Sequence, residues 1–248
     1  MNNKRMMKFW LLTSVTLFSL FLLLQVPAAW LLKKFAPELR HIHNVNGNIW
    51  TGQADWQTSH LKGTIHWNTR PWELIRLRTA ANVTIHSGQT QLDGIVSYGL
   101  GKRLYIKNLQ GEISPDTLSQ IMPWQWPATH IKLQDVNVVY QKQVGFNDVD
   151  GQMTWAGGAL QYTVGPRNER LDVPPLIAQL THQDNKFKIA VQDSQKQRMA
   201  DLALGADQML DIQITQRFLL HSPSYKGQAG MDTAVITTRQ PLHSLGGM

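Results

Sequence analysis

Ser59 and Lys62 are the side chains whose spacing could support covalent catalysis. A serine followed three positions later by a lysine matches the nucleophile motif of penicillin-binding enzymes. The Lys-Thr-Gly and Ser-Asp-Asn motifs that complete such a site do not follow in this sequence. The pair also falls where we expect a hairpin turn, not the start of a helix. We therefore expect no catalytic residue here, and the sequence predicts a protein that is not an enzyme.

Imidazole and carboxylate side chains occur in two short groups that could bind a metal ion. His41 and His43 lie on one side of an extended segment, with Glu38 as the only nearby acid. A structural zinc ion takes four protein ligands and a catalytic one takes three with a water, so this group is incomplete. Asp148 and Asp150 are followed by no further carboxylate at the spacing of a calcium loop. We expect no metal site and no cofactor.

The elements that would position any site begin with an apolar run over residues 9–32. This run contains no charged side chain, and cationic residues flank both of its ends. A helix that crosses a membrane needs about 20 mostly apolar residues. The run therefore predicts one transmembrane helix, a signal anchor, and the short preceding tail over residues 1–8 favours a cytoplasmic N-terminus.

A cleaved signal peptide is the alternative interpretation of the same run. Its apolar core would cover residues 9–24, and Val26, Pro27 and Ala28 would supply a small-residue cleavage site. The core is long for a signal peptide and the apolar run resumes at Ala28, which favours a retained anchor. Under either interpretation the chain is exported, and its function belongs to the far side of the membrane.

The net charge of +7 is concentrated beside this apolar run. Lys4, Arg5, Lys8, Lys33 and Lys34 account for five of these charges, which leaves a net charge of +2 for the rest of the chain. Basic clusters interleaved with aromatic residues are absent from the sequence, so we expect no nucleic-acid partner. The chain has no cysteine, which excludes disulfides, so an exported domain must be held together by its core.

Most of the chain after the apolar run alternates apolar and polar residues, with glycines between the alternating segments. Period-two alternation predicts strands with one buried face. We expect strands over residues 45–56, 61–67, 80–86, 89–98, 103–110, 129–142, 148–155, 159–164, 176–182, 186–191, 199–204 and 209–216. The predicted fold class is all-β, a twisted antiparallel sheet or an open, barrel-like groove.

Two short helices interrupt the predicted strands. Pro71 can occupy the first turn of a helix over residues 71–76, and Ser114 can cap a second helix that begins at Pro115. The predicted organisation is a linker over residues 33–44, a β domain over residues 45–221 on the far side of the membrane and an irregular C-terminal tail over residues 222–248. We expect one short strand in that tail, near residues 234–237.

The first predicted strands carry a glycine–tryptophan motif that resembles a known family. The motif residues are Val45, Gly47, Ile49, Trp50, Gly52, Ala54, Gly63, Ile65, Trp67, Pro71, Trp72 and Leu74. With the flanked N-terminal anchor, this pattern resembles the protein N family of bacterial type II secretion systems. The resemblance is specific over residues 45–74 and general, in length and strand pattern, over the rest.

The resemblance implies a single-pass inner-membrane protein with a β-rich periplasmic domain. On this basis we expect a non-enzymatic component of the type II secretion machinery, involved in protein export across the outer membrane. Its partners would be other inner-membrane components of that machinery. The same motif also resembles the opening of AsmA-like periplasmic proteins, which form lipid-binding β-grooves, so a lipid-binding or lipid-transfer function is the alternative.

Two sets of tryptophans could have structural or interface roles. We expect Trp50, Trp56 and Trp67 to be core and corner residues of the first hairpin, with a hydrogen-bond partner for each buried indole N–H. Trp124 and Trp126 lie between two prolines in an extended segment, so both indoles face the same way. Because tryptophan is enriched at interaction hot spots, this pair is a candidate partner contact, with a lid over the sheet end as the alternative.

Overall fold

One large antiparallel sheet dominates the computed structural model, which describes residues 3–35, 39, 41–58, 60–99, 101–122, 124–164 and 166–242. The helices are α1 (Asn3–Leu24), α2 (Ala28–Phe35), the 3₁₀ helix η1 (Pro71–Arg76), α3 (Pro115–Ile121) and α4 (Gln216–Leu219). The strands are β1 (Ile42–Gly47), β2 (Thr51–Gln57), β3 (Lys62–Thr69), β4 (Arg78–Ser87), β5 (Thr90–Gly99), β6 (Arg103–Ile113), β7 (Ile131–Gln141), β8 (Gly145–Trp155), β9 (Gly158–Val164), β10 (Arg167–Val173), β11 (Leu176–Gln183), β12 (Lys186–Asp193), β13 (Arg198–Leu204), β14 (Met209–Thr215) and β15 (Ala234–Pro241).

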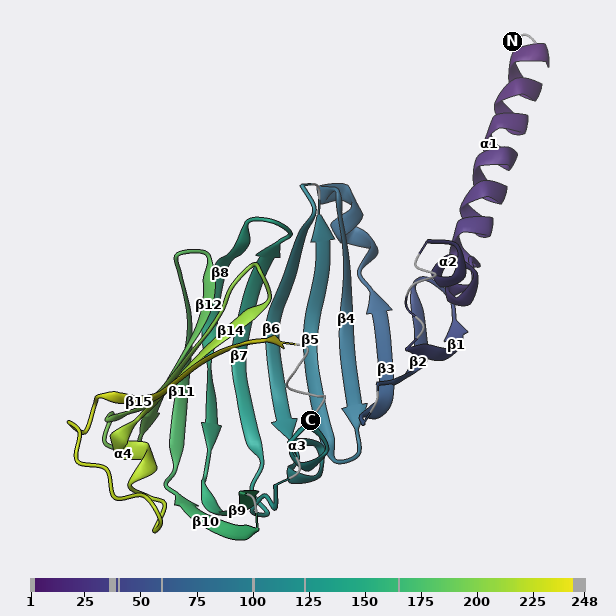
Figure 1. Ribbon diagram of the computed structural model, residues 1–248. Coiled ribbons are helices and arrows are strands. Elements are labelled where there is room, and N and C mark those ends of the chain that lie inside the picture. The colour runs from purple at the N-terminus through teal and green to yellow at the C-terminus, as the bar shows by residue number, and fades with distance from the viewer. Residues whose placement is uncertain are drawn as a thin grey trace.

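Within the described residues, thirteen strands follow one another across this sheet in the order β1 to β8 and then β11 to β15 (Figure 1). Only the β9–β10 hairpin, which pairs with itself, leaves the sequence order. Strands β1 and β15 are the two edges, so the sheet is open. The mostly-β architecture expected from the alternating sequence pattern is confirmed.

The strand register places apolar side chains on one face of the sheet. Ile65 of β3 lies opposite Ile85 of β4, which lies opposite Leu92 of β5. The residues between them, such as Thr64 and Thr84, point to the other face and are mostly polar. The same alternation continues at the far end, where Leu180, Ile189, Leu202 and Ile212 are successive cross-strand partners.

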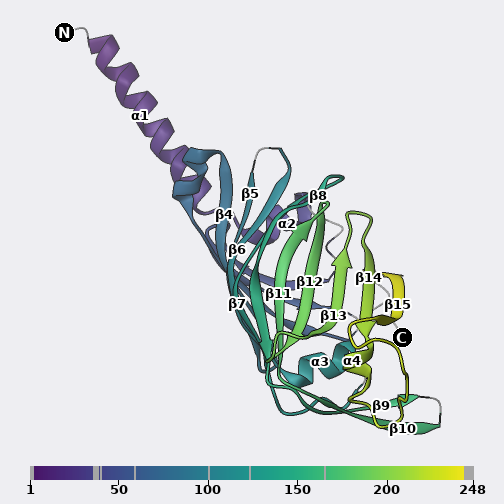
Figure 2. The same cartoon turned by 90° about the vertical axis from the view of Figure 1, so that its left-hand side faces the viewer.

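The sheet is a single curved layer. Strands β3–β5 face the viewer in Figure 1, whereas β11–β14 face the viewer after the 90° turn of Figure 2. The accessible surface is 16524 Å², against about 11000 Å² for a compact monomer of this mass. The fully buried cluster at the centre is correspondingly small and consists of Leu133, Val136, Val149 and Leu180.

Bulges in the central strands contribute to the curvature. The register shifts between Gln134 and Asn137 of β7, opposite Gly151 of β8. Gly151 has φ +137°, and a Cβ atom there would lie 2.7 Å from the Cα of Val136. The backbones of β7 and β8 therefore approach more closely than side chains allow, and such bulges bend the strand that carries them.

The single helix expected over residues 9–32 is instead two helices. Helix α1 ends at Leu24, and α2 begins at Ala28. Pro27 explains the break, because it lacks an N–H and disfavours helical backbone at Val26. None of the helices, over the residues that the structure describes, has both the length and the hydropathy required to span a membrane. The hydroxyls of Thr13 and Thr16 donate to helix carbonyls four residues earlier, at 2.9 Å each.

Both expected short helices are present, at η1 and α3. Ser114 caps α3: its side chain is fully buried and accepts a hydrogen bond from the N–H of Thr117. The single strand expected over residues 45–56 is instead two antiparallel strands, β1 and β2, with a turn between them. Strand β10 and the single-turn helix α4 were also not expected from the sequence. The sequence pattern missed β10 because Arg167–Val173 is rich in charge, and only its pairing with β9 makes it a strand.

Strand β15 lies within the segment expected to be an irregular tail. It is longer than the strand expected near residues 234–237, and it pairs with β14 along its length. Arg239 of β15 forms ion pairs with Asp207 at 2.6 Å and Asp211 at 3.5 Å. The Met209 N–H, and then Arg239, lower the pKa of the Asp207 carboxyl below its ordinary value.

Candidate functional site

An apolar pocket of about 370 Å³ lies between α2 and the first three strands. All of its lining side chains are apolar: Ala28, Leu31, Leu32, Ile42, Val45, Ile49, Ala54, Ile65 and Trp67. Its volume falls in the range of about 300–1000 Å³ that is typical of small-molecule sites. The pocket can accept an apolar group, and its lining offers no acid, base or nucleophile for catalysis.

Helix α2 forms one wall of the pocket because the chain around Pro27 is bonded to the β1–β2 turn. The Ile49 N–H donates to the Val26 carbonyl at 3.1 Å, and Pro27 forms an isolated bridge with Asn48. Ala28, Leu31 and Leu32 then share one helical face, because they are three and four residues apart. This docking gives the C-terminal part of the apolar run a role in the folded domain.

The β1–β2 turn is shaped by Asn48 and Gly47. The Asn48 side-chain oxygen accepts the N–H groups of Trp50 at 2.9 Å and Thr51 at 2.8 Å. Gly47 has φ +93°, and a Cβ atom there would lie 2.4 Å from the Thr51 carbonyl oxygen. Only glycine suits this position, and the turn directs Ile49 into the pocket.

Trp67 forms the floor of the pocket. Its indole N–H donates to the Asn48 carbonyl at 3.1 Å, and its ring lies against Gly52 on the neighbouring strand. A Cβ atom at Gly52 would lie 2.3 Å from the ring atom Cζ2 of Trp67. Gly52 and Trp67 of the motif are therefore complementary in shape.

The expected hydrogen-bond partners of the first-hairpin tryptophans are found for Trp67 and missing for Trp56. The buried Nε1 of Trp56 has no hydrogen-bond partner in the described structure. This atom lies over Gly63, where a Cβ atom would lie 2.8 Å from it and 2.0 Å from the His86 carbonyl oxygen. Gly63 is therefore required by packing, because a larger side chain would clash with the His86 carbonyl and the Trp56 ring. The unsatisfied buried N–H of Trp56 is a separate cost to stability at the same place.

The structure brings most of the glycine–tryptophan motif together. Val45, Ile49, Ala54, Ile65 and Trp67 line the pocket. The motif glycines allow the close approaches described above. By contrast, Pro71 and Trp72 lie on the exposed turn η1, with Trp72 79% exposed, and the Leu74 side chain lies outside the described part of the chain.

Sequence reasoning missed the contribution of α2 and Ile42 to the pocket. Ala28, Leu31 and Leu32 belong to the run that predicted a membrane helix. Pro27, within that run, was the signal that could have separated the two helices.

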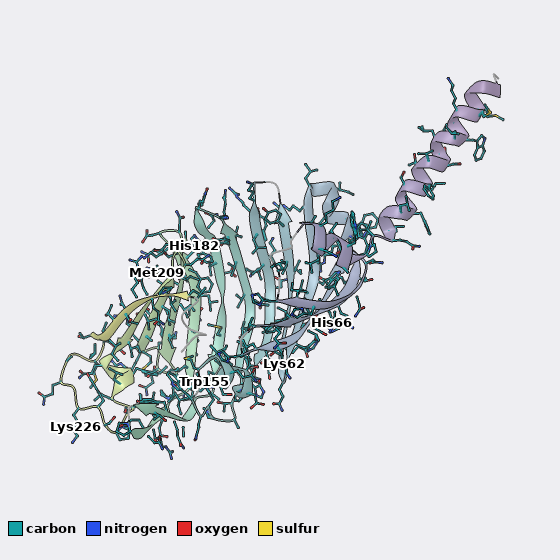
Figure 3. All side chains as sticks on the ribbon, turned by 45° about the vertical axis from the view of Figure 1, so that its right-hand side comes forward. Lys62, His66, Trp155, His182, Met209 and Lys226 are labelled. Atoms are coloured by element: carbon teal, nitrogen blue, oxygen red, sulfur yellow. The ribbon has the colours of Figure 1, made fainter. Side chains whose placement is uncertain are left out.

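Trp124 and Trp126 belong to an aromatic cluster at the end of the sheet remote from α1, where Figure 3 labels Trp155. The ring centroids of the pair are 5.8 Å apart and the rings are stacked. Trp126 also contacts Trp155 and packs on the buried residues of the β9–β10 hairpin. Trp124 is 37% exposed, so its outer edge remains available to a partner.

The other residues singled out by spacing do not form a site in the described structure. Ser59 lies outside the described residues, and Lys62 is exposed at the start of β3. His41 and His43 are exposed, and Asp150 accepts a hydrogen bond from Asn137 at 3.1 Å. Among the residues that the structure describes, no three or more His, Asp or Glu side chains lie close enough together to hold a metal ion.

These features define a single-layer antiparallel β protein with an apolar pocket at its first hairpin. Residues 40–232 match the family model described as type II secretion system (T2SS), protein N. The chain belongs to this family and is therefore a component of the type II secretion system, the envelope machinery for protein transport. The expected family is confirmed. A search among curated proteins found no match, and neither did a search among solved structures.

Proposed function

We propose that this protein is a non-enzymatic assembly component of the secretion machinery, anchored in the inner membrane by the apolar part of α1, residues 9–24. Its N-terminus would be cytoplasmic and its β domain periplasmic, where it meets other inner-membrane components of the system. The observation that carries the anchoring is the surface of α1. The apolar side chains of α1 that the structure describes are exposed to solvent, and they include Phe9, Trp10, Leu11, Leu12, Val15, Leu17, Phe18, Phe21 and Leu22, each more than half exposed.

Apolar side chains on every side of a projecting helix indicate an apolar environment, because soluble helices keep a polar face. Helix α1 extends away from the sheet in both Figure 1 and Figure 2 and packs on none of its strands. Lys8 near its start and Lys33 and Lys34 beyond its end suit the two polar boundaries of a membrane. Docking of α2 on the β1–β2 turn would hold the sheet next to that boundary.

Photo-crosslinking in intact inner membranes tests the assembly role. A photoreactive residue at Trp124 is expected to crosslink to other secretion components, because this side chain is exposed at the rim of the aromatic cluster. A photoreactive residue at Leu118, which is only 7% exposed, is the matched control and should give no intermolecular product. Equal crosslinking from both positions, or none from Trp124, would contradict the proposed contact.

Binding of a lipid is the second candidate function, and the apolar lining of the pocket favours it. Ala54 lies at the centre of β2 and is only 4% exposed. Ala54→Leu should fill the pocket, so we expect a lipid that copurifies with the full chain in mass spectrometry to be lost from this variant. Ala80→Leu, at a comparably buried alanine outside the pocket, should retain the lipid. Lipid retained by both variants would exclude the pocket, and loss of secretion without any bound lipid would favour the assembly role alone.

A further inference from the structure

The β3–β4 turn exposes large apolar side chains that the pocket does not use. Trp72 and Ile75 of η1 are each 79% exposed, and the adjacent Leu77 is 66% exposed. Tyr98, near the β5–β6 turn at the same end of the strands, is 50% exposed. Single exposed apolar residues are common, but three on one short turn form a patch that indicates an interaction.

This turn is held in place by the strands around it. The Arg70 N–H donates to the Ala80 carbonyl at 2.7 Å, and Arg70 Nε donates to the Asn82 side chain at 3.0 Å. The Thr69 N–H donates to the Trp50 carbonyl, and the Thr69 hydroxyl donates to the Ile49 carbonyl at 2.7 Å. These bonds fix the start of the turn, and Trp72 and Ile75 are exposed to solvent directly after it.

Cationic side chains lie at the same end of the neighbouring strands. The strand register aligns Arg78, Gly99, Arg103 and Gln141 across four neighbouring strands. Lys102 and Lys142 lie in the turns that follow Gly99 and Gln141. Among the side chains that the structure describes in these three turns, the cations are Arg70, Arg78, Lys102, Arg103 and Lys142, and the one acid is Glu73.

These three turns, with their basic and aromatic side chains, are called the docking edge below. They lie at the end of the sheet from which α1 projects. Figures 1 and 2 both place the turn between β3 and β4 at the height of the lower end of α1. The hydrogen bonds agree with this placement. The N–H of Ile49 in the β1–β2 turn donates to the Val26 carbonyl, just after α1, and the Thr69 N–H donates to the Trp50 carbonyl in the same turn.

We propose that this edge docks on the surface of a bilayer that contains anionic phospholipids. Trp72 and Ile75 would enter the headgroup region, where the amphipathic ring of tryptophan is favoured. The five cations would contact anionic headgroups. The inference rests on the proposed anchoring by α1 and adds a second, peripheral contact that fixes the orientation of the sheet on the membrane.

The absence of cysteine allows nitroxide labels to be placed at single positions in the full chain. The full chain would be reconstituted in vesicles of phosphatidylcholine alone or with phosphatidylglycerol. A label at Trp72→Cys reports on the docking edge, and a label at Leu17→Cys reports on the anchor. The control is Gln89→Cys, in the exposed β4–β5 turn at the opposite end of the strands. Collision with oxygen and with a water-soluble nickel chelate measures the depth of each label.

We expect the label at residue 72 to become inaccessible to nickel in the anionic vesicles, while the label at 89 remains accessible in both. A label at 72 that stays aqueous while the label at 17 lies in the bilayer would overturn the docking and leave the anchoring intact. An aqueous label at 17 would overturn the anchoring and the docking together. Shielding of residue 72 only when other secretion proteins are present would assign the edge to a protein partner and overturn the lipid proposal.

Charge neutralisation tests the anionic component separately. Lys102→Gln with Lys142→Gln should reduce the ratio of docked to undocked label by about 25-fold, since each cation near an anionic surface contributes about fivefold. The control is Lys196→Gln with Lys226→Gln. Both lysines are exposed, and Figure 3 labels Lys226 far from α1. An equal change in both double variants, or no change in either, would contradict contact with anionic headgroups.

Discussion

Trp67→Ala is expected to lower the free energy of unfolding of the full chain by about 3 kcal/mol, as for other tryptophans truncated in a core. The substitution removes the floor of the apolar pocket and leaves the Asn48 carbonyl without the indole N–H that it accepts. Urea unfolding in a mild detergent, followed by far-ultraviolet circular dichroism, measures the loss without dependence on tryptophan emission.

Trp72→Ala is the matched control, because Trp72 belongs to the same motif but is 79% exposed. Its effect on stability should stay within about 0.5 kcal/mol. Trp67→Phe separates packing from hydrogen bonding, since it keeps a ring and loses the N–H, at an expected loss of about 1 kcal/mol. Equal losses for Trp67→Ala and Trp72→Ala would mean that Trp67 does not support the fold as its contacts indicate.

Gly52→Ala is expected to destabilise the chain by about 2–3 kcal/mol, because overpacking forces the surrounding backbone to move. The added Cβ atom would lie 2.3 Å from the Trp67 ring and 2.4 Å from the Asn46 carbonyl oxygen. The measurement is the same unfolding experiment. Gly99→Ala is the control, since its nearest neighbour would be the flexible Arg78 side chain at 3.3 Å.

The double variant Gly52→Ala with Trp67→Ala tests the contact itself. Removing the ring relieves one of the two clashes, so the combined loss should fall short of the sum of the single losses by about 1 kcal/mol, as for residues in contact. Strict additivity would show that the clash with the Asn46 carbonyl alone determines the cost at Gly52.

The amino-acid sequence by itself determined the all-β class and most of the strands, but it did not show the turn that separates β1 from β2 or the strand β10. Alternation is a local property, so residues 209–216 predicted β14 without knowledge of its partners. The glycine–tryptophan motif over residues 45–74 predicted the family, and its Gly47 is explained locally, because it has φ +93° and a Cβ atom there would lie 2.4 Å from the nearby Thr51 carbonyl oxygen. The caps of α3 were also readable, since Ser114 and Pro115 act within one turn.

Only the tertiary structure decided where those local elements lie and what they enclose. The apolar composition of residues 9–32 is the same whether the run forms one helix or breaks into two helices, the second of which packs on the sheet. The break at Pro27 places α2 on the sheet only because Val26 meets Ile49 of another element. Strand β10 exists only through its pairing with β9. The curvature depends on bulges such as the one opposite Gly151, which involve residues on two strands at once. The pocket follows from these long-range contacts, because its nine lining residues come from α2, β1, the β1–β2 turn, β2 and β3.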